Sequence, residues 1–177
     1  MRNDLIKLIP EFDLIQDKDL REKCLQTWEE GMRLGGWKPD DLKRMPFTLL
    51  YDPCPASMLE HTRGNVLVCV GVLDALKAVY ARDLAIDRDI LIAGALLHDV
   101  GKLLEMEEKD GKFVKSRSGK LLRHPVSGAC LAARFGLPEP ILHIIANHSK
   151  EGDGMRRTNE GVLLHHADFT NFEIFAK

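Results

Sequence analysis

Apolar residues recur three and four positions apart along most of the chain, the spacing that places them on one face of an α-helix. The clearest case is residues 17–34, where charged residues fill the intervening positions and Gly35 and Gly36 mark the expected end. The apolar stripe of this expected helix consists of Leu20, Cys24, Leu25, Trp28 and Met32. Because an exposed stripe of this size is unfavourable, we expect the rest of the chain or a second copy in a homodimer to cover it.

The same periodicity, together with capping residues, predicts the other helices. Ser57 and Glu60 form a capping box before a strongly apolar segment, and Asp87 is a suitable N-cap for the next one. The expected helices span residues 4–9, 37–44, 58–82, 87–98, 125–135 and 139–148, with a last one from about residue 159. Between them, three prolines make residues 46–56 a linker-like segment.

Little of the chain favours β-structure. Residues 105–112 are charged and irregular, with a turn signal at Asp110-Gly111, and residues 113–122 are compatible with a small two-stranded hairpin. The sequence therefore predicts an all-α fold, a helical bundle with at most this one hairpin.

Composition limits the domain count and the classes of partner. With 177 residues, 45% of them hydrophobic, the chain can bury one core, which we divide into an N-terminal helical extension at residues 1–56 and a main domain at residues 57–177. A formal net charge of −2 argues against extended nucleic acid or a membrane as a partner. The four cysteines form no CxxC pair, and we find neither a signal-peptide pattern nor an apolar run of roughly 18 to 20 residues, so we expect a cytoplasmic protein.

The candidate chemistry centres on the dipeptide His98-Asp99. It directly follows an apolar run at residues 90–97, so both side chains are expected to be buried. A buried ionisable pair needs a partner, and a divalent cation suits an imidazole beside a carboxylate. A lone His-Asp dipeptide more often forms local hydrogen bonds. Here further candidate ligands lie on or beside expected helices, namely His61, His124, His148 and Asp168.

This ordered set resembles the HD superfamily of metal-dependent phosphohydrolases, whose pattern runs His, His-Asp and a distant Asp, with two further His in dinuclear members. The matching residues are His61, His98, Asp99, His124, His148 and Asp168, followed at the dipeptide by the family's habitual Val100-Gly101-Lys102. The resemblance covers roughly residues 57–177 and implies an HD-domain helical bundle that holds two divalent transition-metal ions, with Fe, Mn, Co and Zn all left open. A single ion on His61, His98, Asp99 and Asp168 is the minimal arrangement.

The resemblance implies hydrolysis of a phosphomonoester or phosphodiester, with a nucleotide as the favoured small phosphorylated substrate, by a metal-bound hydroxide. Asp99 would bridge the ions, and Lys102, one helical turn further on, would reach a substrate phosphate. Arg63 and Arg123 flank expected ligands and are weaker candidates for the same contact. We find no nucleotide fingerprint or aromatic cage that would read a base.

Two alternatives stay open. The first is a di-iron oxygenase, because some HD-fold proteins use the same ligands to hold two irons for oxygenase chemistry. The second is a non-catalytic nucleotide-binding signalling module, which would need a degraded ligand set, whereas the ligand set of this chain is complete. Residues 149–154 resemble the HD-GYP branch only in part, because Gly154-Met155-Arg156 stands where Gly-Tyr-Pro would be. The remaining histidines, which match no motif position, are His143, His165 and His166.

Overall fold

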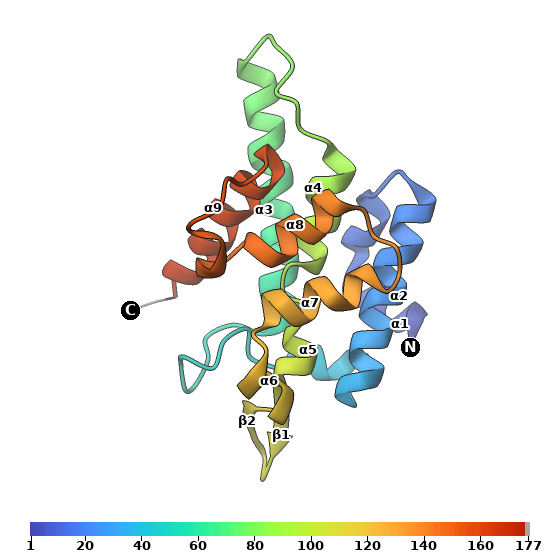
Figure 1. The fold of residues 1–177 in the computed structure, drawn as a ribbon, viewed down its shortest axis with the longest axis vertical. Coiled ribbons are helices and arrows are strands. Elements are labelled where there is room, and N and C mark those ends of the chain that lie inside the picture. The colour runs from blue at the N-terminus through green and yellow to red at the C-terminus, as the bar shows by residue number, and fades with distance from the viewer. Residues whose placement is uncertain (176–177) are drawn as a thin grey trace.

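The computed structural model describes residues 1–175 and folds them into a helical bundle with one small hairpin (Figure 1). The helices are α1 (Arg2–Leu8), α2 (Lys18–Gly35), α3 (Met58–Val79), α4 (Arg88–Leu97), α5 (Lys102–Glu105), α6 (Arg117–Leu121), α7 (His124–Ala133), α8 (Glu139–Asn147) and α9 (Asn159–Glu173). Three short 3-10 turns span Pro10–Leu14, Pro39–Lys43 and Lys150–Gly152, and the second of them replaces the helix expected at residues 37–44. The predicted all-α class is confirmed. The last two residues of the expected main domain, 176–177, lie outside the described part of the chain.

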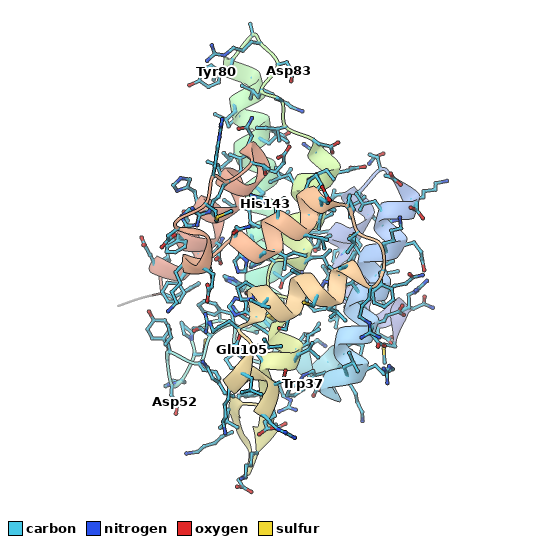
Figure 2. The ribbon with its side chains drawn as sticks, in the orientation of Figure 1. Trp37, Asp52, Tyr80, Asp83, Glu105 and His143 are labelled. Carbon is cyan, nitrogen blue, oxygen red and sulfur yellow. The ribbon has the colours of Figure 1, made fainter. Side chains whose placement is uncertain are left out.

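The helix starts follow the capping signals in the sequence. The Ser57 side chain accepts a hydrogen bond from the Glu60 backbone N–H, while the Glu60 side chain reaches back to the N–H of Ser57. Asp87 caps α4, as expected. α3 ends at Val79, three residues earlier than predicted, and Figure 2 shows Tyr80 close to the tip of the projection that follows.

The core is organised around α4, whose residues 91–97 are all buried. Helices α2, α3, α8 and α9 pack around it. The apolar stripe of α2 is covered within the chain, because Leu20, Cys24, Leu25, Trp28 and Met32 are all buried. The indole N–H of Trp28 donates to the carbonyl oxygen of Leu96 at 2.9 Å, which ties α2 to the residues that precede His98-Asp99. A homodimer is therefore not needed to cover this stripe, and it stays a prediction, as does the division of the chain at residue 56.

The hairpin lies earlier in the chain than predicted. Strands β1 (Met106–Lys109) and β2 (Lys112–Lys115) pair in antiparallel register, and Asp110-Gly111 forms the turn at the end furthest from α3 (Figure 1). Both turn residues have positive φ, 52° and 74°, the geometry that two-residue hairpin turns require. The expectation of a hairpin at residues 113–122 and of irregular chain at 105–112 was wrong, because Ser116 caps the short helix α6 instead.

None of the helices in residues 1–175 combines the length and the apolar character needed to cross a bilayer.

Candidate metal centre

Five helices bring the six candidate ligands together. His61 lies in the first turn of α3, His98 and Asp99 follow the last turn of α4, and His124 begins α7. His148 follows α8, and Asp168 lies within α9. The first five of these residues are buried, and the Asp168 side chain retains 15% exposure.

One group of ligand atoms surrounds one oxygen of Asp99. The Nε2 atoms of His61 and His98 each lie 3.3 Å from Asp99 Oδ2 and 3.4 Å from each other. Asp168 Oδ1 lies 3.0 Å from His61 Nε2 and completes this group.

A second group surrounds the other oxygen. Asp99 Oδ1 lies 3.3 Å from His124 Nε2 and 3.7 Å from His148 Nε2, and these two nitrogens are 3.4 Å apart. The two oxygens of Asp99 thus face different sets of ring nitrogens, as a carboxylate shared by two ions would.

Hydrogen bonds at the far side of each ring turn these nitrogens inward. His98 Nδ1 donates to the Ala95 carbonyl oxygen at 2.7 Å, and His148 Nδ1 donates to that of Ile145 at 2.8 Å. Each bond fixes the tautomer that leaves the Nε2 lone pair free for a metal.

His124 is held by Glu105, a residue that sequence reasoning missed. One carboxylate oxygen of Glu105 accepts hydrogen bonds from both the backbone N–H and Nδ1 of His124, each at 2.7 Å. Glu105 lies in a charged stretch that gave no sign of its burial. It is nevertheless buried, and Figure 2 shows it in the lower part of the bundle, just above the hairpin.

The ionisation states favour cation binding. Burial lowers the pKa of His124 to about 4, so this imidazole is neutral at pH 7. Burial opposes ionisation of Asp99, but the Lys102 ammonium and the hydrogen-bonding histidine rings around the carboxylate outweigh it and hold the pKa of Asp99 well below its usual range. The pKa of His61 is raised, because hydrogen bonds to Asp168 and Asp99 outweigh the effect of burial. A metal ion would take the place of the proton that these two carboxylates attract.

The donor set fits divalent transition metals. His61, His98 and Asp99 form one group with ligand atoms within 4.8 Å of one another, and Asp99, His124 and His148 form another. The 3.4 Å separation of ring nitrogens in each group matches the roughly 3.0 to 3.4 Å between neighbouring ligands that are each about 2.1 Å from one ion. Imidazole with carboxylate suits Mn, Fe, Co and Zn alike.

Two further residues near the ligands were not singled out from the sequence. The side-chain N–H₂ of Asn65 lies 3.1 Å from His61 Nε2, and its oxygen accepts a hydrogen bond from Asn171. His165, which matched no motif, donates from Nδ1 to the backbone carbonyl of His148 at 2.7 Å. His165 therefore holds the backbone of a candidate ligand.

The three candidate phosphate-binding residues have different surroundings. Lys102 donates from Nζ to Asp99 Oδ2 and to the Phe47 carbonyl oxygen, and it lines a pocket of about 360 Å³ above the ligands. Arg123 lines the same pocket. Arg63 instead pairs with Glu11 at 2.9 Å and is not among the lining residues, so we do not carry it into the proposal below.

An all-α bundle with a buried cluster of histidines and aspartates around one shared carboxylate defines a metal-dependent helical domain. Comparison with known protein families identifies the family of this domain. The sequence model of the HD domain matches residues 59–170, and the chain belongs to this family. HD domains bind divalent metals, which agrees with the donor set described above.

Curated relatives support an HD-type hydrolase. The chain is 29% identical to the dihydroneopterin 2',3'-cyclic phosphate phosphodiesterase of Methanocaldococcus jannaschii over 95% of this chain and 69% of that protein. It is 38% identical to ribonuclease Y of Acidothermus cellulolyticus, over 59% of this chain but only 18% of that enzyme. No solved structure matches.

Proposed function

We propose that this chain is a phosphohydrolase that uses two divalent metal ions to cleave a phosphoester bond in a small, nucleotide-sized substrate. The observation that carries the proposal is the position of Asp99, whose two oxygens face two separate pairs of ring nitrogens below a pocket with cationic side chains. When bound, such an ion pair would make a water molecule nucleophilic near neutral pH and neutralise the phosphate it attacks.

The protein's own residues bind and orient the phosphate. Lys102 is fixed by the Phe47 carbonyl beside Asp99, and its ammonium faces the pocket in which the phosphate would lie. Arg123 is held at the pocket wall by Glu151, at 2.9 Å, and by Glu105, at 3.2 Å. Because both cations are held by other groups, little side-chain freedom is lost when an anion binds.

A phosphodiester is the favoured bond. The relative from M. jannaschii is named as a phosphodiesterase for a 2',3'-cyclic phosphate, and it aligns with nearly the whole of this chain. A pocket of about 360 Å³ is at the small end for ligand sites and suits a single nucleotide-sized molecule. The sequence analysis leaves a phosphomonoester open as well, so the test must cover both kinds of ester.

The test is a panel of esters offered to metal-stripped protein that is resupplied with Mn, Fe, Co or Zn. The panel holds a nucleoside 2',3'-cyclic phosphate, bis(p-nitrophenyl) phosphate and p-nitrophenyl phosphate, and oxygen uptake is followed in parallel. We expect metal-dependent ester hydrolysis that is lost in Asp99→Asn and kept in the control Asp83→Asn, which lies on the projection beyond α3 (Figure 2). Oxygen uptake without hydrolysis of any ester would overturn the proposal in favour of a di-iron oxygenase.

A further inference from the structure

Helix α3 is apolar on nearly all of its sides, yet one side of it is uncovered. Between Gly64 and Leu76 its only charged residue is Asp74. A helix that is apolar all round is normally buried. Here Leu67 is 53% exposed, and Val72 is exposed as well. Figure 1 shows the C-terminal part of α3 projecting from one end of the bundle. The part of the chain that the structure describes therefore leaves apolar surface of α3 in contact with solvent.

The exposed residues of α3 include a set that shares one face. They recur three and four positions apart, and we call them the outer face of α3: Leu67, Gly71, Asp74, Ala75 and Ala78. The buried residues Val66, Cys69 and Leu73 lie on the opposite side of the helix. Because three of the five residues of the outer face are glycine or alanine, another helix can approach this face closely.

Gly71 has no packing reason within the described chain. At Gly64 an added Cβ would lie 2.9 Å from Oδ1 of Asn171, and at Gly94 it would lie 2.8 Å from a methyl carbon of Ile144. At Gly71 no atom of the described residues lies within 4 Å of that position. Glycine in a helix interior is destabilising relative to alanine. A close approach by a second molecule at this point would explain why a glycine stands here.

The outer face is complementary to a second copy of itself. If two copies of α3 pack antiparallel about a two-fold axis midway between Leu67 and Gly71, the leucine of each copy lies over the glycine of the other. Arg63 lies eleven positions before Asp74 on the same flank of the helix, so this arrangement also brings Arg63 of each copy near Asp74 of the other. Arg63 contacts Glu11 and Asp74 contacts Arg88 within the chain, but both side chains stay partly exposed.

We propose that the outer face of α3 is the interface of a homodimer in which the two α3 helices pack antiparallel across a two-fold axis. The stripe on α2 is covered within the chain, so α3 is the helix that a second copy would cover. The contact from residue 63 to residue 78 extends over about 24 Å of helix. One helix from each copy gives an interface at the low end of the usual size range, so we expect a dissociation constant of about 1 to 20 µM. None of the five residues of the outer face lines the pocket, so this inference goes beyond the proposed hydrolysis.

The test is analytical ultracentrifugation of the full chain from about 1 to 200 µM. Gly71→Leu is the main variant, because its side chain enters open space in the single chain but fills the contact in the dimer. It should weaken the dimer by about 10- to 100-fold. The melting temperature of the diluted monomer should stay the same or rise, because leucine favours a helix more than glycine does.

A second variant and a matched control locate the interface. Leu67→Glu should also weaken the dimer, because it places a carboxylate in an apolar contact. Leu121→Glu makes the same change on α6, where Leu121 is 78% exposed and lies outside the outer face, and it should leave the dissociation constant unchanged.

Two results would overturn the proposal. The first is a chain that stays monomeric over the whole concentration range, which would leave the outer face to a different protein. The second is a dimer that both Gly71→Leu and Leu67→Glu leave intact, because that dimer would use another face. These measurements need neither substrate nor metal, so their outcome is independent of whether the chain hydrolyses an ester.

Discussion

Replacing Glu105 with glutamine tests how the His124 ligand is held. The Glu105 carboxylate accepts two hydrogen bonds from His124 at 2.7 Å and one from Arg123 at 3.2 Å. Glutamine preserves the shape but removes the charge, and its N–H₂ group faces the donor of Arg123. Since hydrogen bonds to charged groups are stronger than neutral ones by about 1 kcal/mol each, the variant should lose about 2 to 3 kcal/mol of stability. For a chain of this length, that corresponds to a fall of about 5 to 10 °C in melting temperature.

The same change should weaken metal binding. Without the fixed acceptor at Nδ1, the His124 ring is free to change tautomer or orientation, and loss of such supporting hydrogen bonds typically costs about 10- to 100-fold in metal affinity. The assay is calorimetric titration of metal-stripped protein with Mn or Zn, with the bound metal counted by elemental analysis. Glu107→Gln is the control, because Glu107 is exposed on β1 two residues away. An unchanged affinity and stoichiometry in Glu105→Gln, with a melting temperature within about a degree of wild type, would refute this account of the site.

Three further predictions follow from the buried polar groups. With the two-ion site proposed above, Asp99→Asn should leave at most one ion per chain and lower the proposed hydrolysis by more than about 100-fold, since a shared ligand matters more than a supporting residue; two retained ions would contradict the shared role of Asp99. Trp28→Phe should cost about 1 to 3 kcal/mol in urea unfolding, because the buried Leu96 carbonyl loses its 2.9 Å donor, and an unchanged unfolding midpoint would show that this bond contributes nothing. The pKa of His124 is lowered from 6.5 to about 4 in the folded chain, so on acidification the unfolded chain binds a proton at His124 before the folded chain does. The metal-free protein should therefore lose stability as pH falls from about 6.5 to 4. Over that window the wild-type chain should lose about 3 kcal/mol more than His124→Gln, and parallel stability curves for the two proteins would rule the effect out.

Local sequence signals predicted most of the helices because they act through neighbouring residues. Helix α3 begins directly after the capping box of Ser57 and Glu60, and α4 begins directly after the N-cap Asp87, as the sequence analysis predicted. The hairpin was misplaced because the signal at Asp110-Gly111, a strong one for a two-residue turn, was assigned to a loop, and residues 117–121 form a helix instead.

The order of the candidate ligands was also accessible from the sequence, and the HD family assignment is confirmed over residues 59–170. Two roles among the supporting residues were not accessible. Glu105 appeared to be part of a charged surface, yet it is buried against His124. Arg63 appeared to be free for a phosphate, yet it pairs with Glu11, 52 positions away.

The sequence by itself determined most of the helices, the caps of α3 and α4 and the candidate metal ligands, because these depend on periodicity and on side-chain chemistry within a few positions. Only the tertiary structure decided that the two oxygens of Asp99 face different ring nitrogens and that Phe47 and Phe172 form one wall of the pocket. Phe47 and Phe172 are distant in sequence, and their contact depends on how the loop before α3 packs against α9. Hydrophobic burial favours any packing that covers apolar surface, so it does not by itself specify which distant side chains come into contact. The contacts between such side chains are therefore seen only in the assembled helical bundle.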